Sequence, residues 1–129
     1  MKAGYGTFFD YRRRCVTAII DCLYKKTVVW PDENERKEIA KRMHEGFGFP
    51  GCVGVVDGTL FNLAFCPQTE DFSDYHGRKG KFTMTCMVVN DDQKMIRYFH
   101  AGWPGVVHDD RVMFNSKLCR KADEHFCPT

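Results

Sequence analysis

Residues 53–65 read VGVVDGTLFNLAF, and this stretch decides the fold expected for the chain. It is rich in β-branched and apolar residues and carries no helix signal, so it predicts a long strand, Val53–Phe65. Asp57 stands out because an ionised carboxylate in an apolar run costs free energy unless it meets a cation or donors. Gly58 beside it leaves room for a ligand or another backbone. The alternative is a carboxylate at a bulge, hydrogen-bonded to the backbone.

Two further strands are expected after a polar loop, over residues 82–89 and 95–103. Residues 90–94 join them, and a link this short favours antiparallel neighbours, so the three strands are predicted to form a meander. The Trp-Pro-Gly-Val sequence at 103–106 suits a turn with proline second and glycine third. A helix from about Asp109 to Lys121 is expected to follow.

Residues 1–50 are predicted to form a helical segment ahead of the sheet-bearing residues 51–129. Thr7 can cap a first helix, and Asp32 can cap a second one because Glu35 stands three residues after it. Apolar residues recur at helical spacing in both helices. They are Phe8, Tyr11, Cys15, Ile19 and Leu23 in the first, and Ile39, Met43 and Phe47 in the second, which Gly46 and Gly48 end.

The predicted order is helices, three antiparallel strands and a helix, which is an α+β fold. One more parallel strand would complete an α/β fold, and we expect the chain to be truncated before that strand. The outer edge of the sheet is then left with unpaired backbone groups, which invite pairing with another chain. We therefore expect self-association through this open sheet edge.

The composition suits one folded domain and excludes several classes of protein. The chain has 129 residues, 43% hydrophobic and 14% aromatic, so disorder is not expected. No apolar run is long enough to cross a bilayer, and the first residues do not form a secretory signal, so no membrane partner and no secretion are expected. Seven cysteines without a Cys-x-x-Cys pair predict buried free thiols rather than a zinc site or a disulfide scaffold.

The positive charge is clustered rather than high. The net charge of +2 and the pI of about 8.2 fall short of a dedicated nucleic-acid binder. The run Arg78-Lys79-Gly80-Lys81 is a local basic patch, with Tyr75 and His76 nearby. It is interpreted either as a phosphate-binding site on DNA, through Arg78, Lys79 and Lys81, or as a solvated loop.

Asp109, in His108-Asp109-Asp110-Arg111, is the second candidate acid. One interpretation is an acid stabilised by the start of a helix. The other makes it a metal ligand beside Asp57, with hard oxygen donors that select Mg²⁺ or Mn²⁺. Two such ions activate water and stabilise the leaving oxygen in phosphodiester cleavage. In that case the two carboxylates must point into one pocket, close enough to share an ion.

Three motifs, in this order, resemble the PIF/Harbinger-type DDE superfamily transposases and the nucleases derived from them. They are Gly51–Thr59, Tyr75–Gly80 and Trp103–Arg111, and the lead-in Phe47–Gly51 also fits. The resemblance implies a ribonuclease H-like fold, of which residues 51–129 would be the N-terminal part of the DDE nuclease domain. It also implies a divalent-metal nuclease that hydrolyses phosphodiesters and transfers strands on DNA, in the nucleus or the cytoplasm.

The same resemblance gives catalytic and metal-binding roles to two residues. Asp57 matches the family's first acidic ligand, and Asp109 matches the acid after the histidine, as a core or an accessory ligand. The family's later aspartate and glutamate have no match here, so the catalytic set is incomplete. The separate DNA-binding protein with which the family usually works is another partner that the resemblance implies.

Three interpretations therefore stay open. The first is a DDE-type nuclease or transposase domain that retains metal-binding residues and is inactive as it stands. The second, from another class, is a non-catalytic DNA-binding or protein-interaction module derived from a transposase. The third is a gene-model fragment without a function.

Overall fold

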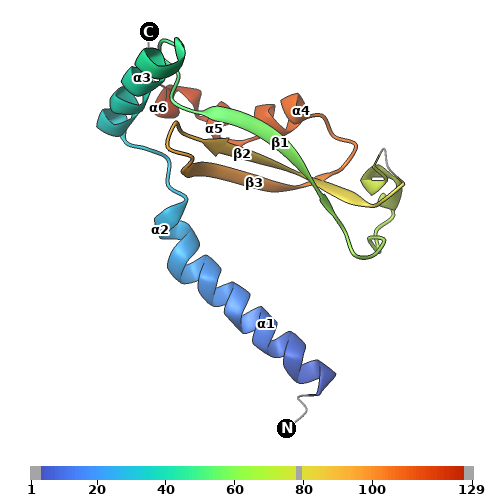
Figure 1. Ribbon diagram of the computed structural model, residues 1–129. Helices are drawn as coiled ribbons and strands as arrows, with labels where there is room; N and C mark the ends of the chain where they lie inside the picture. Colours follow the sequence, from blue (N-terminus) through green and yellow to red (C-terminus); the bar gives the residue numbers. More distant parts are fainter. Residues whose placement is uncertain (1–3, 78–79, 127–129) are drawn as a thin grey trace.

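Three antiparallel strands form the centre of the computed structural model, which describes residues 4–77 and 80–126 (Figure 1). β1 (Val55–Asn62) pairs with β2 (Thr83–Asn90), and β2 pairs with β3 (Ile96–Pro104). The predicted meander and the α+β class are therefore confirmed. The order of elements also fits the partial ribonuclease H-like fold that the resemblance implies.

The strand boundaries differ from the predicted ones by small amounts. β1 is shorter than Val53–Phe65 because Asn62 already faces Thr83, the first residue of β2. Beyond it, the backbone N–H of Leu63 still donates to the carbonyl oxygen of Phe82 at 2.8 Å. β2 and β3 each lie one residue further along the chain than predicted.

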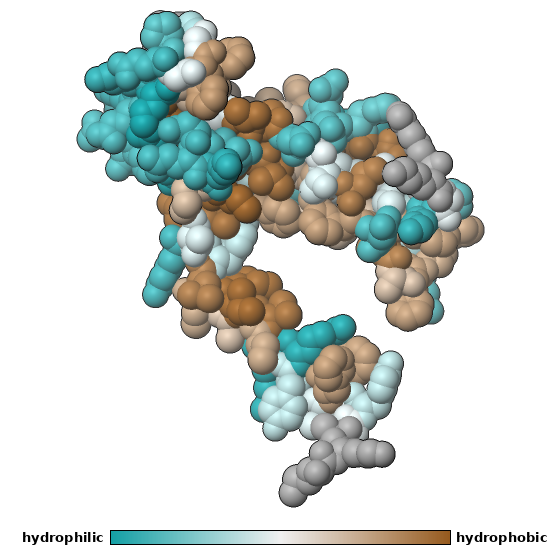
Figure 2. Space-filling model, in the orientation of Figure 1, coloured by the Kyte–Doolittle hydropathy of each residue, from teal (hydrophilic) through white to brown (hydrophobic). Residues whose placement is uncertain are grey.

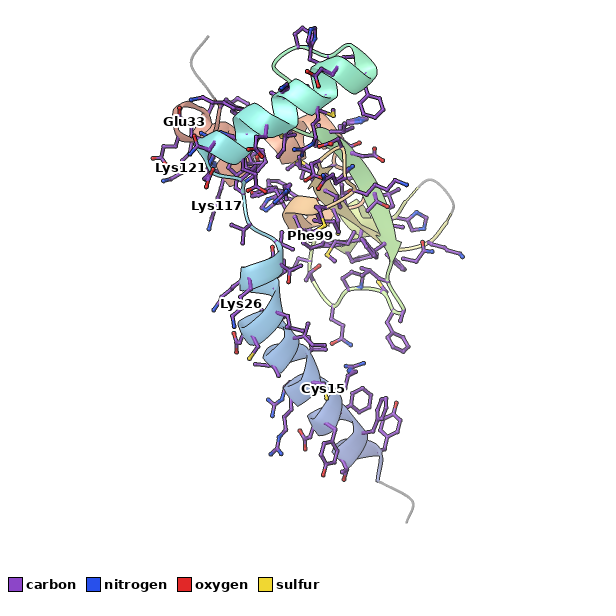
Figure 3. All side chains as sticks on the ribbon, turned by 60° about the vertical axis from the view of Figure 1, so that its left-hand side comes forward. Cys15, Lys26, Glu33, Phe99, Lys117 and Lys121 are labelled. Atoms are coloured by element: carbon purple, nitrogen blue, oxygen red, sulfur yellow. The ribbon has the colours of Figure 1, made fainter. Side chains whose placement is uncertain are left out.

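The N-terminal helix projects away from the sheet as a rod (Figures 1 and 3). This N-terminal rod consists of α1 (Tyr5–Ile19), the π-helical turn η1 (Ile20–Tyr24) and α2 (Lys25–Thr27), and none of its residues is buried. Its start is two residues earlier than Thr7, with Gly4 at the N-cap and no side-chain cap, so the predicted Thr7 cap is wrong. The apolar spacing predicted the helix, but nothing among the described residues covers it.

α3 (Glu33–Phe47) follows the prediction closely. Asp32 caps it by accepting a hydrogen bond from the backbone N–H of Glu35 at 2.9 Å. Gly48 ends it with a φ of 75°, a left-handed conformation that glycine adopts without steric cost. Ile39 and Met43 are buried, as expected, whereas Phe47 is 64% exposed and does not belong to the core.

A network of charged side chains joins α3 to the turn between β2 and β3. The carboxylate of Asp91 is fully buried and accepts from Arg97 Nε at 2.7 Å, as well as from two backbone amides of its own turn. Arg97 also pairs with Glu35 of α3 at 2.8 Å. Asp92 binds Arg42 of α3 through two hydrogen bonds, which lower the pKa of Asp92 and raise that of Arg42. The turn predicted at residues 90–94 thus also anchors α3.

The predicted helix Asp109–Lys121 is instead three short helices, α4 (Asp109–Phe114), α5 (Lys117–Arg120) and α6 (Ala122–His125). The break lies at Ser116, a residue type that favours N-caps, whose hydroxyl accepts from the N–H of Cys119 at 3.2 Å. Buried Val112 and Leu118 hold these helices to the body, and α4 packs against β2. The turn before α4 also begins one residue later than predicted, since the N–H of Val107 donates to Pro104.

The described cysteines are all free, as predicted. Cys86 on β2 is buried, and burial raises the pKa of its thiol. Cys15, Cys22 and Cys66 are exposed, so the expectation of buried thiols is wrong for these three. Across residues 4–77 and 80–126, no helix is long and apolar enough to cross a membrane.

Candidate functional site

Asp57 lies near the start of β1, opposite Val88 of β2, and its side chain is exposed. Exposure removes the desolvation cost that singled it out in the sequence, because water solvates a carboxylate on an edge strand. β1 pairs with β2 in one continuous register, so Asp57 does not sit at a bulge. Its carboxylate is accessible to a ligand from outside the chain.

Gly58 of β1 and Asp109 of α4 pack directly against each other. The carboxylate of Asp109, the first residue of α4, lies where a side chain at position 58 would be. A Cβ atom on residue 58 would overlap both carboxylate oxygens. The space predicted for a ligand or another backbone is therefore filled by a side chain of the same protein.

This contact decides on which side of the sheet each acid lies. Successive side chains of a strand leave on opposite faces. Because Asp109 lies on the face toward which a Cβ of Gly58 would point, Asp57 leaves from the other face. The structure therefore does not bring Asp57 and Asp109 into one pocket, and the expectation of a shared ion is not met in this arrangement.

A pocket of about 430 Å³ lies beside Asp109. β1 contributes Gly58 and its next two residues, and β2 contributes Thr85. The other walls come from the segment before β2 and from the segment that leads into the first residue of α4. The groups able to exchange hydrogen bonds with a ligand there include His76, Thr85, His108 and Asp109. Asp57 is not among the lining residues. The imidazoles of His76 and His108 can exchange hydrogen bonds with a polar ligand, whereas the Thr85 hydroxyl already donates to the carbonyl oxygen of Pro104 at 3.3 Å.

Two glycines close the sheet end of this pocket. Gly77 and Gly105 both pack so tightly against Thr83 that a Cβ on either would overlap the threonine side chain. Among residues 4–77 and 80–126, the buried Thr83 hydroxyl finds no hydrogen-bond partner. The loop after Gly105 is tied to the preceding 3₁₀ helix η2 (Phe72–Tyr75), because Val106 N–H donates to Asp74 at 3.2 Å. The pocket wall is thus built by packing between two loops.

Few side chains that could bind a metal ion lie close together in the part of the chain that the structure describes. No three His, Cys, Asp or Glu side chains converge among residues 4–77 and 80–126. Asp57 and Asp109 are each exposed and each able to offer carboxylate oxygens to a hard cation. They lie on opposite faces, however, so they do not fit a two-metal centre as arranged here.

The structure describes only part of the basic patch. Arg78 and Lys79 lie outside the described residues. Lys81 is exposed, and its carbonyl oxygen accepts from the N–H of Gly77 at 2.8 Å, next to the pocket. The interpretation of Arg78, Lys79 and Lys81 as phosphate ligands stays a prediction.

His100, on β3, contacts two other residues of the same strand. Its Nε2 accepts a hydrogen bond from Trp103 Nε1 at 3.0 Å, and its ring stacks on Tyr98. Because that nitrogen accepts, its lone pair is already engaged and is not offered to a metal ion.

His108 and Thr85 were not predicted from the sequence as site residues. His108 could have been found, since it directly precedes Asp109 at the start of α4. Thr85 could not, because its place beside β1 depends on the register between β1 and β2.

Comparison with known proteins places these observations in context. The family described as DDE superfamily endonuclease matches residues 56–129. The candidate nuclease HARBI1 of Homo sapiens and that of Rattus norvegicus are each 30% identical over 110 residues, covering 81% of this chain and 31% of theirs. A protein named ALP1-like from Arabidopsis thaliana is 36% identical over 90 residues, covering 67% of this chain and 21% of its own.

The chain spans about a third of the length of the HARBI1 relatives it matches, 31% in each case. No solved structure matches it significantly.

The Gly58–Asp109 contact predicts a specific coupling between the two positions. Gly58→Ala should destabilise the fold by ~1–3 kcal/mol, because the new methyl group displaces the carboxylate. In an Asp109→Gly background, which removes the carboxylate, the cost should fall by about 1 kcal/mol or more. Chemical denaturation of the four proteins in this cycle measures the coupling.

Gly46→Ala is the matched control, since nothing lies within 4 Å of a Cβ there and the residue is helical. It should be neutral or stabilise by up to ~1 kcal/mol. Equal costs of Gly58→Ala in both backgrounds would contradict the described contact.

Proposed function

Because the chain belongs to the DDE superfamily endonuclease family, related to the Harbinger-derived nucleases, we propose that it is part of a divalent-metal-dependent DNA nuclease. We further propose that this 129-residue chain, taken alone, does not cut DNA. The reactions concerned are phosphodiester hydrolysis and strand transfer. One observation carries the second part of the proposal, namely that the carboxylates of Asp57 and Asp109 lie on opposite faces of the sheet.

The geometry explains why cleavage would fail. Two-metal cleavage needs ions fixed on both the attacking and the leaving oxygen, with carboxylates that hold them a few ångströms apart. Mg²⁺ in addition requires nearly ideal octahedral geometry and gives up its water reluctantly. Asp57 and Asp109, separated by the sheet, can each hold an ion loosely without orienting a phosphodiester between them.

DNA is the proposed partner, and its contacts would be electrostatic. Exposed Lys81 lies at the end of the basic run that includes Arg78 and Lys79. Phosphate contacts of this kind give sequence-independent binding, so a separate DNA-binding protein would have to supply sequence specificity. A function on DNA would also place the protein in the nucleus.

A non-catalytic DNA-binding or protein-interaction module is the second candidate function. The separation of the two acids favours it as well, because binding does not require them to converge. Cleavage and binding assays on the same preparation distinguish the two functions.

Plasmid nicking tests the proposal about catalysis. With Mg²⁺ or Mn²⁺, the purified chain should nick supercoiled DNA no faster than its Asp57→Ala variant. Fusion to the segment that follows the matching region in a HARBI1 relative should bring nicking, and Asp57→Ala should then remove it. Rapid metal-dependent nicking by the chain alone, lost in Asp57→Ala, would contradict the proposal. A fused chain that binds DNA but never nicks it would favour the second function.

Fluorescence anisotropy with labelled duplexes tests the proposed DNA contacts. Binding should be weak, independent of sequence and strongly weakened by salt, because each neutralised phosphate releases counterions. The triple substitution Arg78→Ala, Lys79→Ala, Lys81→Ala should weaken binding to all duplexes alike. Lys117→Ala, which removes an exposed lysine from α5, serves as the control and should change little. Tight binding that salt does not affect would contradict this account.

A further inference from the structure

The N-terminal rod carries more positive charge than the whole chain does. Over residues 5–27 it has five basic and two acidic side chains, a net charge of +3, whereas the chain as a whole has +2. The basic residues are Arg12, Arg13, Arg14, Lys25 and Lys26, and the acidic ones are Asp10 and Asp21. The remaining residues together carry a net negative charge. A polyanion is therefore attracted to the rod more than to the rest of the molecule taken as a whole.

The cations of the rod are exposed and only weakly neutralised. Within the described residues, the rod has two ion pairs, Arg13–Asp10 at 3.7 Å and Lys25–Asp21 at 3.8 Å. More than half of each of these side chains is exposed, and such surface pairs contribute little to stability. Arg12 and Arg14 belong to neither pair, so their charges are available to a ligand. Figure 2 shows hydrophilic as well as apolar surface on the rod.

Arg12 and Arg14 leave α1 in nearly opposite directions. Successive residues of an α-helix are turned by about 100°, so these two are about 160° apart around the axis by the shorter way. The middle of that shorter arc carries Tyr11, Cys15 and Ala18, all of them exposed. Cys15 and Ala18 are small, so the helix can approach a surface closely there. We call this side, with an arginine on either flank, the arginine-flanked face.

Phe9 and Val16 lie on the other side of the rod. Val16 is turned by about 160° from Ala18, and Phe9 by about 160° from Tyr11. Protein atoms that cover Phe9 and Val16 therefore leave the arginine-flanked face open. Contact of that face with a polyanion is thus independent of what covers the apolar side.

On the basis of the proposed function on DNA, we infer that the arginine-flanked face lies in the major groove of duplex DNA. Arg12 then contacts phosphates of one strand and Arg14 those of the other. An α-helix with its side chains is about 10–12 Å across, and the major groove is about 12 Å wide. The rod projects from the body, so a duplex can lie along it (Figures 1 and 3). A flat anionic surface such as a membrane meets one side of a helix and engages only one of these arginines.

Fluorescence anisotropy of the whole chain with duplex DNA measures the two arginine contacts. Arg12→Ala with Arg14→Ala should lower the slope of log affinity against log salt concentration by about 2, because each lost phosphate contact removes about 0.9. Lys41→Ala with Lys117→Ala is the matched control, since it removes two exposed lysines from α3 and α5. It should leave the slope unchanged. An unaltered slope in the arginine variant, or equal changes in both variants, would overturn the inference.

Ala18→Glu and Val16→Glu place the same charge on the two sides of α1. Ala18→Glu should weaken binding about tenfold, because its carboxylate then faces the phosphates, whereas Val16→Glu should weaken it less than about threefold. Glutamate is a good helix former, and circular dichroism checks that both variants keep the helix. Equal losses would show that only the total charge matters, against the inference.

Dimethyl sulfate identifies the groove, because it methylates guanine N7 in the major groove and adenine N3 in the minor groove. Saturating protein should slow methylation of guanine about twofold or more and leave that of adenine unchanged. Protection of adenine instead, or of neither base, would contradict the major-groove contact. Binding of the chain to anionic lipid vesicles but not to duplexes would overturn it as well.

The triple substitution Arg78→Ala, Lys79→Ala, Lys81→Ala separates this contact from the proposed function. If that variant loses DNA binding and the arginine variant of the rod does not, the rod does not contact DNA, yet the proposed function stands. If the rod variants behave as expected but the chain fused to the following HARBI1 segment never nicks DNA, the groove contact stands and the nuclease function fails.

Discussion

The contact between Gly58 and the carboxylate of Asp109 is the constraint on which the candidate site depends. Because residue 58 lacks a side chain, the start of α4 can approach β1 until the carboxylate lies on the strand itself. That approach fixes where α4 begins and forms one wall of the pocket that His76 and His108 also line. It also fixes the face of Asp109 relative to Asp57. Gly58 thus matters because it leaves space for the Asp109 carboxylate, and not because it makes the strand flexible.

Asp57 and Asp109 are neighbours through Gly58 and yet lie on two sides of one sheet. The chain belongs to a family described as endonucleases. Because the two acids are separated by the sheet, they do not act together on one metal ion in this segment. A carboxylate on an edge strand remains solvated and available, but metal-assisted cleavage needs several oxygen ligands directed at one point. The chain spans about a third of the HARBI1 relatives, 31% of their length, so the proposals for activity concern what this segment contributes.

Features encoded by local sequence could be predicted, and those that depend on distant packing could not. The antiparallel pairing of β2 and β3 followed from the short link between them, and the cap of α3 from Asp32 and Glu35, because these depend on residues close together in the chain. Asp91 and Asp92 help to anchor α3 through ion pairs with Arg97 and Arg42. No sequence pattern predicts these pairs. Likewise, helical periodicity predicted α1 but not its exposure. The candidate acids were found from motifs and composition. The faces of the sheet on which they lie could be assigned only from the register of β1 and the position of the start of α4.

The central claim is that Asp57 and Asp109 do not share an ion, and paramagnetic broadening by Mn²⁺ in amide NMR spectra tests it most directly. The account predicts two separate groups of broadened amides, one around Asp57 and one around Asp109. Asp57→Asn should abolish only the first group and Asp109→Asn only the second. A single group of broadened amides that either substitution abolishes completely would show that both carboxylates hold one ion, and would contradict the account.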